Sequence, residues 1–150
     1  MNDEKILAQL NEYYATLKEA DALYGLLAKE SGLSDATLWV LYSIRQMEGE
    51  CTQKTVVEQW AMSKQTVHSA VNDLLREGLI MLFPSAKDRR RKRIVLTEAG
   101  VAFAEKNIDT IYDLECAAFG QLGEEERRNL INAGRRYLEL FRREVLSYLK

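Results

Sequence analysis

The first thirty residues carry the hydrophobic pattern of one long amphipathic helix. Apolar side chains recur at alternating spacings of four and three over residues 3–30, at Ile6, Leu10, Tyr13, Leu17, Ala20, Tyr24 and Leu27. These are the a and d positions of a heptad repeat, which predict a helix on the order of 40 Å long at 1.5 Å per residue. A helix of this length extends beyond a small domain, so its apolar stripe predicts a packing partner.

The helical period continues through three shorter segments, residues 34–47, 52–60 and 63–77. Each begins with a serine or threonine, whose side-chain oxygen can accept a hydrogen bond from a free backbone N–H group in the first turn. Glycines follow several of the apolar stripes and suit the left-handed residue that ends a helix. The expected N-caps are Ser34, Thr52 and Ser63, and the expected stop residues are Gly32, Gly49 and Gly78.

The period changes after residue 78. Leu79–Phe83 and Lys92–Leu96 are short runs suited to strands, and the turn residues between them predict a β-hairpin. Thr97 can cap a long helix from Glu98 to about Gln121. A break at residues 122–123 precedes three glutamates, which favour the start of a last helix that runs to the C-terminus.

This order predicts a mostly α fold in a single domain, residues 1–150. Helices followed by a hairpin over residues 34–97 are typical of a winged helix-turn-helix lobe. Residues 3–30 and 98–150 would then form a helical dimerisation lobe, because their apolar stripes exceed what the central lobe can cover and an identical subunit is the simplest partner.

Positive charge is concentrated in the predicted hairpin. The chain has a formal net charge of −2, yet six of its 21 Lys and Arg residues lie at positions 87–93. Residues 85–100 hold six basic and two acidic side chains, a net +4 that leaves −6 for the rest. This pattern indicates local attraction to a polyanion. The alternative is a solvated charge run that protects a hairpin edge from strand pairing.

Several functional classes find no support in the sequence. There is one histidine, His68, no Gly-rich phosphate loop and no nucleophile–base pattern, so we expect neither an enzyme nor a cofactor or metal site. Cys51 and Cys116 are expected to be reduced packing residues, with Cys51 the better candidate for an oxidation sensor. No apolar run of bilayer length and no secretion signal is seen, so a cytoplasmic protein without a membrane partner is expected.

One motif resembles a known family. The pattern Asp88-x-Arg90-x-x-x-Ile94-x-Leu96-Thr97-x-x-Gly100 is similar to the wing signature of the MarR family of regulators. The helix order, the chain length and the Leu-Leu-Arg-Glu-Gly-Leu-Ile run before the hairpin also match. The resemblance implies a homodimeric DNA-binding repressor or activator, often released by a small phenolic or lipophilic effector or by oxidation.

The wing residues have expected roles in DNA binding. By match to the family motif, Arg90 should enter the minor groove, where narrow stretches concentrate negative potential. Asp88 should brace the tip by accepting hydrogen bonds from a wing arginine or a backbone N–H group. The remaining cations should divide between phosphate contacts and solvent; they are Lys87, Arg89, Arg91, Lys92 and Arg93.

Residues 63–77 should form the recognition helix. Val67, Val71 and neighbouring apolar residues define its buried face at 100° per residue, and a polar face lies opposite. The side chains expected to read base edges in the major groove are Gln65, Ser69 and Asn72. Those expected at phosphates are Lys64, Thr66, His68 and Arg76. The alternative is an ordinary solvated helix face. Family members often carry arginine where Ser69 stands, so strong guanine readout is not expected there.

Two further expectations concern partners. A DNA-binding homodimer should recognise a pseudo-palindromic operator in double-stranded DNA; the competing hypothesis is a winged-helix module whose wing binds an acidic protein. The aromatic candidates for a pocket that would take a small aromatic or lipophilic effector are Tyr13, Tyr24, Trp39 and Tyr42. Their spacing equally suits core or dimer packing, which is the favoured interpretation.

Overall fold

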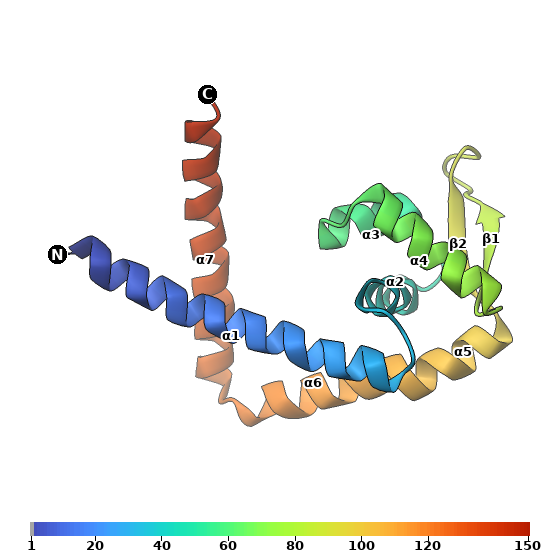
Figure 1. Ribbon diagram of the computed structural model, residues 1–150, viewed down its shortest axis with the longest axis horizontal. Helices are drawn as coiled ribbons and strands as arrows, with labels where there is room; N and C mark the ends of the chain where they lie inside the picture. The colour runs from blue at the N-terminus through green and yellow to red at the C-terminus, as the bar shows by residue number, and fades with distance from the viewer. Residues whose placement is uncertain (1) are drawn as a thin grey trace. The chain divides into compact units, whose positions relative to one another are not determined.

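The computed structural model describes residues 2–150 and is mostly helical, with one small hairpin (Figure 1). The elements are α1 (Asn2–Glu30), α2 (Asp35–Gln46), α3 (Gln53–Trp60), α4 (Lys64–Arg76), β1 (Ile80–Pro84), β2 (Lys92–Leu96), α5 (Glu98–Ala104), the π-helix η1 (Glu105–Asp109), α6 (Thr110–Gln121) and α7 (Glu124–Tyr148). The predicted fold class, a winged helix-turn-helix with long outer helices, is confirmed.

The predicted helix starts are confirmed by their capping hydrogen bonds. In each case a side-chain hydroxyl accepts a hydrogen bond from the backbone N–H three residues later, at 3.0–3.2 Å. Such a cap satisfies an N–H group that the helix itself leaves free. The four capping residues are Ser34, Thr52, Ser63 and Thr97.

The core of the winged helix-turn-helix is centred on α2, which packs against α1, α3, α4 and β2. The buried face predicted for residues 63–77 is confirmed, since Val67 and Val71 are inside together with their apolar neighbours Ala70 and Leu74. Burial of a large apolar side chain stabilises a fold by about 1.5–3 kcal/mol. The buried side chains are Leu38, Leu41 and Ile44 of α2, Val56 of α3, Val67, Ala70, Val71 and Leu74 of α4, Ile80 of β1 and Ile94 of β2.

The hairpin pairs β1 and β2 antiparallel, from Ile80 opposite Leu96 to Pro84 opposite Lys92. The first strand begins one residue later than predicted, because Leu79 closes the end of α4 instead. Its N–H donates to the Leu74 carbonyl at 3.0 Å, across Gly78 with φ +70°. This is the hydrogen-bond pattern that ends a helix at a left-handed glycine.

Helix α5 starts in close contact with Leu79. A Cβ atom at Gly100 would lie 1.8 Å from the Leu79 carbonyl oxygen, so only glycine permits this approach. The same carbonyl accepts a hydrogen bond from the Thr97 N–H at 3.0 Å. The wing therefore leads directly into α5.

The single helix predicted for residues 98–121 is interrupted by η1. There the Asn107 amide donates to the Phe103 carbonyl at 2.9 Å, and the Thr110 hydroxyl donates to the Lys106 carbonyl at 2.7 Å. Side chains that bond to carbonyls four residues back compete with the helical ladder, which fits a change to the wider π-helical turn.

The chain divides into two compact units, Met1–Thr110 and Ile111–Lys150. The first holds the winged helix-turn-helix and α1, whose Ala28 is buried. The second holds α7, which has no buried residue. Within residues 2–150, no helix has both the length and the apolar composition of a membrane span.

Candidate nucleic-acid interface

The outer face of α4 is a ridge of exposed polar side chains. Gln65, Ser69 and Asn72 are exposed, while Val67 and Val71 on the opposite side are fully buried. The helix is thus fixed by its apolar face and presents amide and hydroxyl groups to solvent. These are the groups that can pair with base edges in a DNA groove.

The four residues expected to contact phosphates are all exposed, and two of them already have a hydrogen-bond or ion-pair partner in the protein. Lys64 and His68 are exposed at the start of α4. The Thr66 hydroxyl is used in the cap, at 2.7 Å from the Ser63 hydroxyl, and the Arg76 guanidinium pairs with Asp73 one turn earlier. Two of the four predicted phosphate ligands therefore already have partners within α4.

Asp88 makes the contacts expected of a brace at the hairpin tip. Its carboxylate accepts a hydrogen bond from the Arg90 N–H at 3.0 Å and lies 3.5 Å from Nε of Arg91. The Arg91 N–H also donates to the Asp88 carbonyl, and the Ser85 N–H donates to the Arg91 carbonyl at 2.8 Å. The tip is thus held in one shape by its own backbone and one carboxylate.

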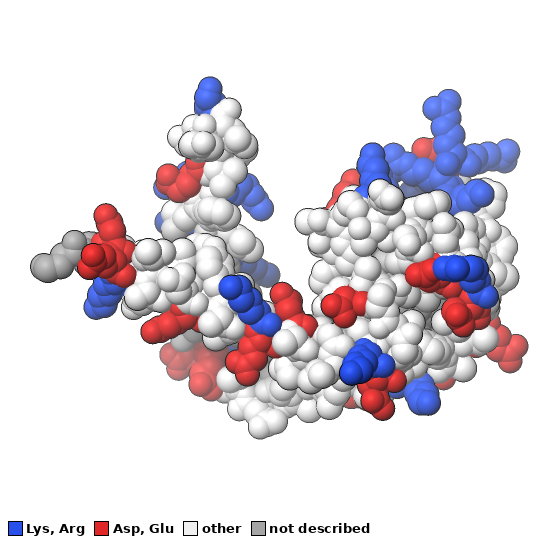
Figure 2. Space-filling model, viewed as in Figure 1, with Lys and Arg blue, Asp and Glu red and all other residues white. Residues whose placement is uncertain are grey.

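Most wing cations project from this tip. In Figure 2, Lys and Arg side chains gather at the end of the hairpin, at the upper right. Within residues 2–150, Arg91 is the wing cation that forms an ion pair, and those that form none are Lys87, Arg89, Arg90, Lys92 and Arg93.

Arg93 differs from the other wing cations. It is half-buried, and its guanidinium carbon lies 5.3 Å from the centre of the Phe83 ring, its cross-strand neighbour. A cation over an aromatic face is stabilising. This contact stabilises the hairpin, and the expectation that Arg93 takes a phosphate or solvent position stays a prediction.

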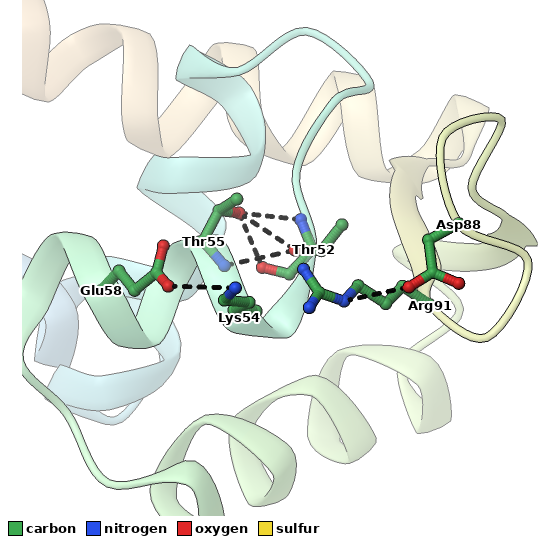
Figure 3. Close-up of polar contacts among 6 residues, drawn as sticks. All are labelled: Thr52, Lys54, Thr55, Glu58, Asp88 and Arg91. Carbon is green, nitrogen blue, oxygen red and sulfur yellow. Dashed lines mark hydrogen bonds and ion pairs between the residues drawn. The ribbon is translucent and has the colours of Figure 1, made fainter.

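A cationic groove lies beside the wing and was not predicted from the sequence. A hollow of about 510 Å³, which we call the three-cation groove, is lined by Gln53, Lys54, Val57, Glu58, Lys64 and Arg91. Figure 3 shows Arg91 reaching from the hairpin toward the start of α3, near Lys54 and its partner Glu58. Lysines in the first turns of α3 and α4, without acidic neighbours there, are the sequence signal that could have indicated it.

The start of α3 is tied to the wing. The Thr52 and Thr55 hydroxyls accept hydrogen bonds from each other's N–H groups, at 3.2 and 2.9 Å (Figure 3). Just before this cap, the Cys51 carbonyl accepts from the Ile94 N–H of β2 at 2.7 Å. The groove is therefore built on a hydrogen-bonded joint between helix and hairpin.

Cys51 is a core residue. Burial raises the pKa of its thiol to about 11, against a smaller opposing effect of the Thr55 hydrogen bond. Oxidation proceeds through the thiolate, which such a thiol does not form near neutral pH. Of the two cysteines, Cys51 was the better sensor candidate in the sequence, and its environment contradicts that role; Cys116 is exposed on α6.

Three of the four aromatic residues proposed for a pocket pack together. The Trp39 ring centre lies 4.6 Å from that of Tyr24, 5.4 Å from Tyr42 and 4.4 Å from Trp60. The Trp60 indole N–H donates to the Ser43 hydroxyl at 2.6 Å. These rings pack against one another, which agrees with the packing role favoured from the sequence.

The fourth aromatic residue, Tyr13, lies three turns earlier on α1. Its ring centre is 6.0 Å from that of Tyr14, and its exposed fraction is 41%. Tyr13 thus lies three turns along α1 from Tyr24 of the ring cluster, and an effector pocket at these aromatics stays a prediction. Among the residues described, no group of three or more His, Cys, Asp or Glu side chains could hold a metal ion.

Comparisons with known proteins show a likeness to the MarR family and to a curated helix-turn-helix regulator. The sequence model of the MarR family matches residues 31–91, from the end of α1 to the wing tip. A curated relative, the uncharacterized HTH-type transcriptional regulator YwhA of Bacillus subtilis (strain 168), is 31% identical over 83 residues, which are 55% of this chain and 60% of that protein. The match thus spans less than two thirds of the relative's length.

Solved structures share the fold along nearly the whole chain. NMB1585, a MarR family regulator from Neisseria meningitidis, matches with a TM-score of 0.76 and 25% identity, over 95% of this chain and 99% of that one. The MepR–DNA complex of Staphylococcus aureus matches with a TM-score of 0.71 and 21% identity, over 86% and 93%. Its wing motif, the exposed polar ridge of α4 and these likenesses make the chain similar to the MarR family of winged helix-turn-helix regulators.

Proposed function

We propose that this chain is a dimeric, sequence-selective transcription regulator that binds double-stranded DNA and represses by occupying its operator. Helix α4 enters the major groove and the basic wing enters the minor groove. The observation that carries the proposal is that an exposed polar ridge and a braced, largely unpaired cationic tip belong to the same compact unit. A cytoplasmic location is part of the proposal, because the ligand is chromosomal DNA.

The ridge supports direct readout of bases. Gln65 lies near the N-terminus of α4, the part of a recognition helix that contacts base edges, and Ser69 lies one turn further. The amides of Gln65 and Asn72 can each bond to N6 and N7 of adenine, which favours a half-site containing A·T pairs. Arg90, from the wing, adds affinity at a neighbouring narrow minor groove.

The outer helices support dimerisation. In the part of the chain that is described, every exposed large apolar side chain other than Met81 and Phe83 belongs to α1, α6, α7 or Leu149, which directly follows α7. Apolar surface of this extent favours a partner, and a second copy would give two recognition helices related by two-fold symmetry. The operator is then pseudo-palindromic, with half-site centres about one helical turn apart.

Fluorescence anisotropy against selected and random duplexes tests the proposal. We expect tighter binding to the selected duplex and a log affinity that falls linearly with log salt, by about 0.9 per neutralised phosphate. A flat salt response with no duplex preference would instead favour a wing that binds an acidic protein. Adding a small phenol to the same titration tests the further expectation that an aromatic or lipophilic effector releases the DNA.

A further inference from the structure

The three-cation groove carries an unusual arrangement of charge. Lys54 lies in the first turn of α3, and Lys64 is the first residue of α4. A cation at a helix start opposes the helix dipole, which favours anions there. Helices α1, α2, α5, α6 and α7 follow the common rule and carry an acidic side chain in their first turn.

Arg91 adds a third cation from the hairpin. Its Nε lies 3.5 Å from the Asp88 carboxylate, and the rest of its guanidinium faces the start of α3 (Figure 3). The three cations therefore come from three elements, α3, α4 and the wing, and line one hollow. Because the wing is hydrogen-bonded to the residues before α3, the cations are held near one another before any ligand binds.

Glu58 is the one acidic residue among the six that line the groove. Its Oε1 lies 3.5 Å from Nζ of Lys54, and the two side chains are 62% and 53% exposed. Lysine placed four residues before glutamate is the less favourable order on a helix, and exposed pairs of this kind contribute little stability. The contact can therefore open at small cost.

We propose that Lys54, Lys64 and Arg91 bind one backbone phosphate of duplex DNA in the three-cation groove, and that Glu58 is the internal counter-ion which this phosphate displaces from Lys54. The inference rests on the proposed DNA-binding function and adds a site to it. In the free protein Glu58 lowers the local positive potential. In the complex it faces the phosphate and limits affinity for any duplex, so that base readout by α4 decides which duplex is bound.

Anisotropy titrations of the full chain over a range of salt concentrations test this assignment. Lys54→Gln should reduce the salt slope by about 1, equally on selected and random duplexes, because a phosphate contact carries no sequence information. Glu58→Gln should tighten binding to both duplexes several-fold and narrow the affinity ratio between them. Lys54→Gln should abolish most of the gain from Glu58→Gln in the double variant.

Glu77→Gln is the matched control. It also removes one carboxylate charge, but Glu77 caps the C-terminal end of α4, whereas the groove is at the start of this helix. Equal effects of Glu58→Gln and Glu77→Gln, or an unchanged salt slope in Lys54→Gln, would overturn the groove assignment while leaving DNA binding intact. Failure of the wild-type chain to bind any duplex would overturn the DNA-binding function as well. Circular dichroism of each variant verifies that the fold is retained.

Discussion

Arg45 of α2 and Asp109, the last residue of η1, form an ion pair through two hydrogen bonds, Nε to Oδ1 at 2.9 Å and Nη2 to Oδ2 at 2.6 Å. The residues are 64 positions apart in sequence, and Asp109 lies next to the boundary between the two compact units. A bidentate pair fixes both distance and orientation. It thus anchors the π-helix to the central helix of the DNA-binding lobe.

Replacing either member should destabilise this anchor. We expect Asp109→Asn to lower the free energy of unfolding by about 0.2–1 kcal/mol, the range measured for solvent-accessible ion pairs. The hydrogen bonds from Arg45 hold the pKa of Asp109 below its ordinary value. A lowered pKa in the folded state gives stability that is present above the unfolded-state pKa and is lost as pH falls through the folded-state value.

Thermal unfolding as a function of pH measures this contribution. The stability difference between wild type and Asp109→Asn should be constant near neutral pH and shrink in acid. Glu105→Gln, in the same π-helix but with an exposed carboxyl, is the control. A difference that persists undiminished at low pH would contradict the assigned role of the charge.

Gln65→Ala should relax base preference at one position of each half-site. The loss follows from the removal of a side chain that can pair with a base edge, and its cost should be about 1–3 kcal/mol for that base pair alone. Selection of bound sequences from a random pool measures it. An unchanged consensus would mean that the exposed ridge of α4 is not the reading face.

Arg90→Ala should weaken DNA binding by about 1–3 kcal/mol, most strongly at sites with A·T-rich flanks. Arg93→Ala serves as a contrast, since Arg93 packs on Phe83. We expect it to reduce hairpin stability more than the salt dependence of binding. Anisotropy and thermal unfolding of both variants separate the roles, and identical behaviour would refute the distinction.

Gly100→Ala should destabilise the joint between the wing and α5, because a Cβ atom would overlap the Leu79 carbonyl. The cost should be about 1–3 kcal/mol, as for other overpacked sites. Gly120→Ala is the control, since a Cβ there meets nothing within 4 Å and alanine favours a helix. Denaturant unfolding of both variants should give changes of opposite sign.

Analytical ultracentrifugation should show a dimer at micromolar concentration, because the apolar faces of α1 and α7 need a partner. Leu138→Glu, on the exposed apolar side of α7, should shift the equilibrium toward monomer and weaken operator binding with it. Arg136→Glu on the same helix supplies a charge change away from the apolar residues. A wild-type monomer would contradict the proposed dimer.

The local signals in the sequence located most of the fold. Ser63 marked the start of α4 because a cap acts within three residues, and Val67 and Val71 marked its buried face because that face repeats at the helical period. The same period placed Gln65, Ser69 and Asn72 on the exposed side. These features depend on near neighbours in the chain.

What the sequence did not indicate depends on distant neighbours. The Arg45–Asp109 pair joins residues 64 positions apart, and no local motif in the sequence marks the π-helix. Arg93 was grouped with the tip cations because its contact with Phe83 depends on hairpin register. Lys54 was overlooked because its proximity to Arg91 arises only when α3 and the wing are joined.

The ring contact between Trp39 and Trp60 has a practical consequence for spectroscopy. These are the two tryptophans of the whole chain, and both belong to the packing of α2 and α3. Their emission will therefore follow the opening of that helix pair, while melting of α7 passes without a tryptophan signal. A heat or urea titration followed by tryptophan emission alone would report the unfolding of the lobe that contains α4. Far-ultraviolet circular dichroism would be needed to follow the unfolding of the remaining helices.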